Sequence, residues 1–211
     1  MGKGKPVGRR QQRKRPVKRT CLVVTEGKKT EPDYLLDLNR QEFRLSIQVS
    51  DGHSDPGHVV SGAVRRKRDS EDGPVSYDEI WCVFDADDIS AETLESAMDR
   101  ARSEGIWVAL SNPCFELWLL LHYRYTTGQM RTCKKARNLL RKHVPGYEKS
   151  APACSELRER LAEAIANAEK LRKHHRDSTG GKEHTWNPCT GVDALVRALQ
   201  KAAREQKRAR P

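Results

Sequence analysis

The 211-residue sequence lacks any long apolar run. Its longest apolar run lies within Cys114–His122, far short of the roughly 20 residues that span a membrane. The basic N-terminal segment is also followed by no apolar stretch of the kind found in secretory signals. We therefore expect neither a transmembrane nor a secreted protein.

The spacing of the cysteines excludes the common cysteine motifs. The six cysteines include no C-x-x-C pair, which argues against a zinc ribbon or a thioredoxin-like redox site. Cys21 and Cys82 lie in short apolar segments, as buried free thiols commonly do. Without a secretion signal, we expect reduced cysteines in a cytoplasmic protein.

The sequence also contains no G-x-x-x-x-G-K-[ST] segment and no repeat of fixed period. A G-x-x-x-x-G-K-[ST] segment forms the phosphate-binding loop of many ATPases. We therefore do not expect this chain to hydrolyse ATP by the mechanism of P-loop proteins.

Positive charge is concentrated at the two ends of the sequence. The formal net charge is +11, and residues 1–20 hold nine Lys and Arg residues with no acid. Residues 200–211 hold five more with one acid, which leaves residues 21–199 near neutrality. Such ends favour contact with a polyanion, nucleic acid first. The alternative is a disordered, solubilising tail.

Apolar runs alternate with helical patterns over residues 20–125, and this alternation indicates βαβ units in a mainly parallel sheet. We expect strands at 21–25, 45–49, 79–84 and 106–110, with helices from Pro32 and over 59–68, 90–103 and 113–123. Beyond about residue 130 the pattern is helical, over 132–143, 155–175 and 189–208, with no expected strand. The prediction is therefore an α/β fold followed by a C-terminal helical lobe.

Carboxylates follow two of the expected strands. Glu26 directly follows the first strand and Asp85 the third, so parallel strands would bring both to one edge of the sheet. Asp85 and Asp87 are two residues apart, and in an extended segment both would point the same way. Converging carboxylates need a cation, and oxygen ligands select Mg²⁺ or Mn²⁺. Alternatively, Asp87 merely begins the next helix.

Other residues near the same edge are candidates for the site. Glu116 and Asn112 follow the fourth strand, where they would either join a metal or phosphate site or simply begin the next helix. Glu31 is a further candidate carboxylate. Lys28 and Lys29 are candidates for phosphate contact, although loop lysines are often only solvated.

The segments Thr25-Glu26-Gly27 and Asp85-Ala86-Asp87, in a βαβ chain, resemble the Toprim domain of topoisomerases, primases and OLD-type nucleases. The resemblance implies a Toprim/Rossmann-like sheet. It also implies that Glu26 is a general acid/base and that the Asp85/Asp87 pair holds the metal. Alternatively, Glu26 would be a further metal ligand, as Glu116 would be if its position after the fourth strand brings it into the site.

More narrowly, the chain resembles the RloB family over about residues 19–200. The matching segments are Arg19–Tyr34, Trp81–Asp88, Ser111–Tyr123 and Asn187–Thr190. RloB-like proteins are found with restriction and phage-defence genes, often beside an ATPase. The charge and periodicity patterns, with the Toprim resemblance, divide the chain into a disordered basic arm at 1–19, a Toprim-like α/β domain at 20–128 and a helical extension with a basic tail at 129–211.

These observations lead to an expected function. We predict a cytoplasmic, Mg²⁺- or Mn²⁺-dependent nuclease that cleaves RNA or DNA in phage defence by abortive infection, with an ATPase partner. The alternative is a non-catalytic, nucleic-acid-binding adaptor in an ATPase-containing complex. A topoisomerase- or primase-like transfer reaction would need a tyrosine-nucleophile module or a zinc ribbon, and neither can be identified in the sequence.

Overall fold

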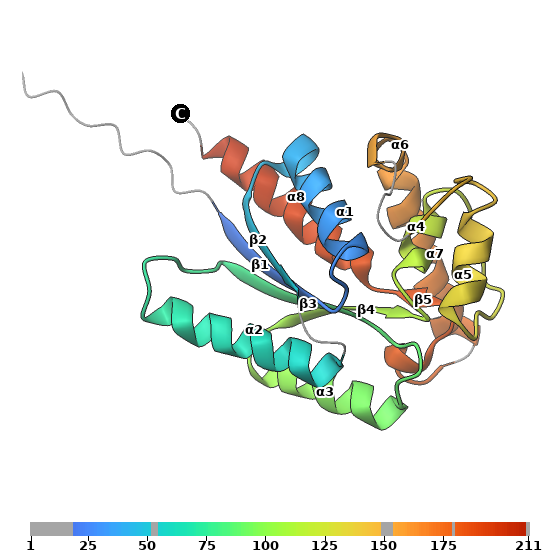
Figure 1. Cartoon of the computed structure of the whole chain (residues 1–211), viewed down its shortest axis with the longest axis horizontal. Coiled ribbons are helices and arrows are strands. Elements are labelled where there is room, and N and C mark those ends of the chain that lie inside the picture. The colour runs from blue at the N-terminus through green and yellow to red at the C-terminus, as the bar shows by residue number, and fades with distance from the viewer. Residues whose placement is uncertain (1–18, 52–54, 149–153, 179, 210–211) are drawn as a thin grey trace, which may run out of the picture.

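The computed structural model describes residues 19–51, 55–148, 154–178 and 180–209, and its strands form one five-stranded sheet (Figure 1). The sheet has the order β2-β1-β3-β4-β5, and its strands are β1 (Thr20–Thr25), β2 (Ser46–Asp51), β3 (Glu79–Asp85), β4 (Trp107–Asn112) and β5 (Cys189–Thr190). The pairings among β1 to β4 are parallel, and β5 runs antiparallel to β4. The predicted mainly parallel sheet is confirmed.

Helices flank the sheet on both faces, and a helical region lies beside its β5 end. The helices are α1 (Thr30–Leu38), α2 (Pro56–Glu71), α3 (Ala91–Ser103), α4 (Glu116–Leu121), α5 (Cys133–Leu140), α6 (Cys154–Glu159), α7 (Leu161–Ser178) and α8 (Val192–Arg208). A π-helical turn, Asn39–Phe43, continues α1, and a 3₁₀ turn, Glu183–Thr185, precedes β5. Figure 1 shows α2 and α3 on one face and α1 and α8 on the other.

The apolar run of β1 supplies side chains to both faces of the sheet. Leu22 and Val24 belong to a core shared with α2 and α3, whereas Cys21 and Val23 belong to the larger core on the opposite face. A strand buried on both faces has no polar side of its own, which explains why its sequence is a continuous apolar run. The larger core also includes side chains from α4, α5, α7 and α8.

Two helices begin at capping side chains. Ser90 Oγ accepts a hydrogen bond from the Thr93 N–H at 3.2 Å and so caps the start of α3. Asp55 Oδ1 accepts from the His58 N–H at 3.2 Å in the same way. This second cap starts α2 earlier than the helix expected over 59–68, because a side chain there satisfies a backbone donor of the first turn.

The expectation of no strand beyond residue 130 is wrong. β5 lies within the helix expected over 189–208, and it pairs with the end of β4. The hydroxyls of Ser111 and Thr190 lie 2.9 Å apart across this pairing. A strand of two residues is too short to produce a periodic pattern, so only its pairing with β4 defines it.

Two other expected helices differ in extent. The helix expected over 113–123 contains α4 only from Glu116 to Leu121, and the helix expected over 155–175 is divided into α6 and α7. Phe115, just before α4, donates its backbone N–H to the Asp85 side chain. The backbone N–H of Phe115 therefore binds the Asp85 carboxylate at the edge of the sheet.

The basic arm expected at 1–19 lies outside the described residues except for Arg19. The Arg19 guanidinium pairs with Glu205 of α8 at 2.8 Å, and its backbone N–H donates to Gln206 Oε1 at 3.2 Å. The chain therefore enters β1 against the last helix. None of the helices that the structure describes combines the length and the apolar character of a membrane span.

Candidate functional site

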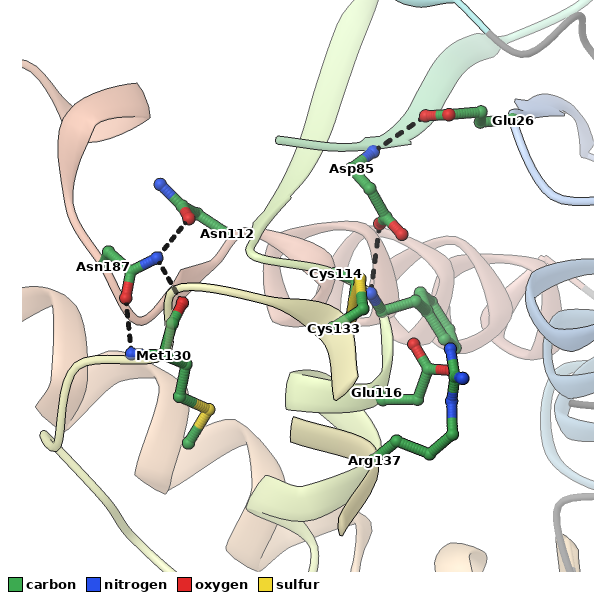
Figure 2. Close-up of a disulfide and its surroundings, with 10 residues drawn as sticks. Glu26, Asp85, Asn112, Cys114, Glu116, Met130, Cys133, Arg137 and Asn187 are labelled. Atoms are coloured by element: carbon green, nitrogen blue, oxygen red, sulfur yellow. Dashed lines mark hydrogen bonds and ion pairs between the residues drawn. A yellow bond between two sulfur atoms is a disulfide. The ribbon is translucent and has the colours of Figure 1, made fainter. Parts of the chain in front are cut away.

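Glu26 and Asp85 lie at the same edge of the sheet, because they follow adjacent parallel strands. The Glu26 N–H donates to the Val83 carbonyl at 2.9 Å, which continues the β1–β3 pairing past the end of β1. The Glu26 carboxylate then turns back, and its Oε2 accepts from the Asp85 N–H at 3.0 Å (Figure 2). The two acidic residues are thus joined by a direct hydrogen bond.

The Asp85 carboxylate is surrounded by other acidic groups. Its pKa is raised well above the usual range by removal from solvent and by the negative charges of three carboxylates, Glu31, Glu26 and Glu116 in decreasing order of effect. The Phe115 N–H, which donates to Asp85 Oδ1 at 3.0 Å, opposes this rise. Without a cation, the ionised form of Asp85 is therefore unfavourable here.

A pocket of about 360 Å³ opens at this edge. It is lined by Glu26–Glu31, the loop after β1 and the start of α1, together with Asp85, Phe115 and Glu116. The lining includes four carboxylates and the two lysines of the loop. All-oxygen acidic donors of this kind suit a hard divalent cation such as Mg²⁺ or Mn²⁺.

Gly27 is required by the packing of this loop. A Cβ atom at Gly27 would overlap the Glu31 carboxylate, which lies against the loop backbone. Glu31 is 7 % exposed, so its side chain has little room to move away. The close contact explains why the residue after Glu26 has no side chain.

Glu116 has a cationic partner from the helical region. Its carboxylate is buried, and Oε1 accepts from Arg137 Nε at 3.2 Å. Arg137 is a site residue that the sequence did not single out. Its only sequence signal is a place in a basic helix, because the 21-residue separation from Glu116 carries no local pattern.

The structure separates the other sequence-predicted residues of this loop and strand end. Lys28 and Lys29 line the pocket, whereas Asp87 is not among its lining residues. β3 ends at Asp85, the next residues form a turn, and Asp88 has a φ of 59°. The extended geometry that would point Asp85 and Asp87 the same way therefore stops at Asp85.

Asn112 points toward the second N-P-C segment of the chain. Asn112 Oδ1 accepts from Asn187 Nδ2 at 2.6 Å, and Asn187 also bonds both backbone groups of Met130 at 2.7 Å (Figure 2). Asn112 lines a different cavity, beside Arg172 and Cys189. These contacts tie β4 to the loop before α5.

Two cysteines lie next to Asp85. Cys114 and Cys133 form a disulfide, so the expectation of reduced cysteines does not hold for this pair (Figure 2). Their separation of 19 residues matches no motif, and the packing of α5 against α4 brings them together. Cys21, Cys82 and Cys189 are buried free thiols.

The comparisons with known proteins identify a family. The family model described as "RloB-like protein" matches residues 21–199, which is most of the chain. No curated protein matched, and no solved structure matched. The chain belongs to the RloB-like family.

Proposed function

We propose that this member of the RloB-like family is a Toprim-type, metal-dependent nuclease that cleaves phosphodiester bonds in RNA or DNA. One observation carries the proposal: four carboxylates and two lysines line a pocket at the carboxyl edge of a parallel sheet. This edge is where open α/β sheets bind their ligands. The acidic groups suit a cation, and the lysines suit a phosphate.

Asp85 would hold the cation, with Glu31 and Glu116 as additional oxygen donors, and Glu26 would be either a further donor or the general acid/base. Mg²⁺ or Mn²⁺ there would supply positive charge to the phosphate and lower the pKa of a bound water. Asp87 remains a proposed ligand from the resemblance alone. Because Arg137 shares the Glu116 carboxylate, Glu116 is the donor least available to a cation.

The side chains of this chain have distinct roles in the proposed reaction. Glu26 is the proposed general acid/base, and its bond to the Asp85 N–H holds its carboxylate in the pocket. Lys28 and Lys29 would bind substrate phosphates. The basic ends of the sequence would hold the polyanion without reading its bases.

The RloB resemblance supports a role in cytoplasmic phage defence by abortive infection, with an ATPase partner. The sequence has no P-loop, so ATP hydrolysis would belong to the partner. In this arrangement the partner controls when the nuclease acts.

Cleavage assays test the proposal directly. Purified parent protein and the Glu26→Gln variant are incubated with end-labelled DNA, messenger RNA and transfer RNA, in Mg²⁺, Mn²⁺ or chelator. We expect cleavage by the parent that chelator abolishes. Loss of a general acid/base predicts a fall of roughly 100-fold or more in Glu26→Gln. The matched control is Glu92→Gln, an exposed acid on α3, which keeps parental activity.

The adaptor alternative predicts a different result. A parent that binds nucleic acid but does not cleave it, even with its ATPase partner, would contradict the nuclease assignment. Equal phage protection by parent and Glu26→Gln in cells carrying both genes would do the same.

A further inference from the structure

The two cysteines beside Asp85 form a compact cluster with its carboxylate. Both Sγ atoms and one Asp85 oxygen lie within 4.8 Å of one another. Cys114 is fully buried, whereas Cys133, the first residue of α5, is half-buried. Figure 2 shows the cysteine pair on the side of Asp85 opposite Glu26. Two sulfurs and one oxygen within this span can reach a single ion.

Contacts other than the disulfide hold the two cysteine-bearing segments together. The ion pair between Glu116 and Arg137 joins α4 to α5. Asn187 holds Met130, three residues before Cys133, next to Asn112, two residues before Cys114. Reduction of the disulfide would therefore leave both thiols close to each other and to Asp85.

We propose that, in the reduced protein, Cys114, Cys133 and Asp85 bind Zn²⁺. Two thiolates and a carboxylate are a donor set that zinc accepts, and three protein ligands leave its fourth tetrahedral position open. Thiolate sulfur selects zinc over Mg²⁺. The site differs from the proposed all-oxygen site and shares only Asp85 with it.

Zinc binding requires that the disulfide between Cys114 and Cys133 is first reduced. A phosphine reductant takes up the oxygen of one water molecule and becomes the phosphine oxide. The two hydrogens of that water are added to the sulfurs of Cys114 and Cys133, which become thiols. Binding of Zn²⁺ then releases both thiol protons to solvent. Arg137, one turn after Cys133 on α5, pairs with Glu116 and so compensates one of the carboxylates that surround Asp85.

The shared ligand makes the two cations competitors. Zinc bound to Asp85 removes a carboxylate from the oxygen site, so Zn²⁺ would weaken Mg²⁺ binding there. The zinc site itself does not depend on nuclease activity, because cation binding is measured without substrate.

Zinc titration of the reduced full chain, in competition with a chromophoric chelator, tests the site. We expect one equivalent to bind to the phosphine-reduced parent and none to bind at that affinity to the disulfide form. Cys133→Ala and Asp85→Asn each lose one of the three ligands. Their affinities for zinc should fall by at least roughly 10–100-fold, which is the loss expected when even a residue that orients a metal ligand is changed. Co²⁺ in place of Zn²⁺ should give the intense near-ultraviolet band of thiolate-to-cobalt charge transfer.

The control is Cys189→Ala, which removes a free cysteine outside the cluster and should bind zinc as the parent does. Circular dichroism verifies that each variant is folded. A second measurement uses the parent alone: Zn²⁺ should slow alkylation of Cys133. Zinc binding of equal strength in parent and Cys133→Ala, or in parent and Asp85→Asn, would overturn the proposal. A cobalt complex without the thiolate band would also overturn it.

Discussion

The surroundings of Asp85 disfavour the ionised form of its carboxyl group. Removal from solvent and three neighbouring carboxylates raise its pKa, so the folded protein binds the proton of the Asp85 carboxyl group more tightly than the unfolded chain does. The stability that comes from this proton is fully present below the ordinary carboxyl pKa and is lost as the pH rises through the raised value. Above the ordinary carboxyl pKa, therefore, the raised pKa of Asp85 costs stability unless a cation is bound.

Replacing Asp85 by Asn should stabilise the metal-free protein at pH 7. The change removes an uncompensated charge and keeps an oxygen that can accept from the Phe115 N–H. We expect a gain on the order of 1 kcal/mol in the free energy of unfolding, which shrinks in acid as the parental carboxyl becomes protonated. Urea denaturation at several pH values measures it, with Asp69→Asn, an exposed acid on α2, as the control. A less stable Asp85→Asn at pH 7 would contradict this account.

His122 should make the protein sensitive to acid. Its ring is fully buried, with Nδ1 3.0 Å from the Trp118 carbonyl and Nε2 3.3 Å from the Tyr34 hydroxyl. Burial lowers the pKa of His122 to about 4. The stability from this depressed pKa is present above the ordinary value near 6.5 and is lost as the pH falls to about 4.

The expected loss over this pH window is at most about 3 kcal/mol. Urea denaturation in the Asp85→Asn background measures it without the opposing effect of the carboxyl. His122→Gln in that background should flatten the pH profile between 6.5 and 4. An unchanged slope would assign the acid sensitivity to another group.

At the scale of elements, the packing of α5 on α4 completes the candidate site. Glu26 and Asp85 follow strands of the sheet and Glu31 lies in the first turn of α1, whereas Arg137 comes from α5. Arg137 is 26 % exposed and Glu116 5 % exposed in their side chains, so this is a largely buried ion pair. Such pairs add little net stability, but removing one partner leaves a buried charge uncompensated.

Arg137→Gln should therefore destabilise the protein by roughly 1–3 kcal/mol, less than for a fully buried pair because Arg137 is partly solvated. The double variant Glu116→Gln/Arg137→Gln should recover part of that loss, since no charge is then left alone. Chemical denaturation of the single and double variants measures both effects. Lys134→Gln, an exposed residue of the same helix, is the control. If the double variant loses as much as the two single variants together, the charge pair is not the cause.

At the scale of the whole molecule, the sequence concentrates positive charge at its two ends, whereas the described pocket gathers four carboxylates. Residues 1–18 contain eight of the Lys and Arg residues, and Arg19 joins the start of β1 to α8. A metal-loaded acidic site repels nucleic acid less than the free carboxylates do, and basic ends add attraction at a distance. In the proposed function, the basic ends of the sequence therefore provide affinity for nucleic acid, and the residues at the carboxyl edge of the sheet carry out the cleavage.

Deleting residues 1–18 should leave thermal unfolding nearly unchanged, because that segment offers few apolar side chains to bury. Binding to a labelled duplex should weaken, and the slope of log K against log salt should fall by at most about 7. Fluorescence anisotropy at several NaCl concentrations measures the slope. Parental binding at every salt concentration would make the segment a solubilising tail only.

Part of the site could be predicted because it depends on local sequence and one topological rule. The apolar runs of β1 and β3 define buried parallel strands, and residues that follow such strands meet at one edge of the sheet. This reasoning brought Glu26 and Asp85 together. It did not extend to Asp87, because the chain turns after Asp85 and the alternation of an extended strand ends there.

The sequence by itself determined the elements whose stability comes from their own residues: the buried strands, the capped helix that begins after Ser90, and the acidic residues at the strand ends. The tertiary structure decided the pairings of Glu116 with Arg137 and of Cys114 with Cys133, as well as the addition of β5 to the sheet. Periodicity reports only neighbours within a turn or along a strand. Partners separated by 19 residues or more meet only when helices and strands pack, and no local pattern records that packing.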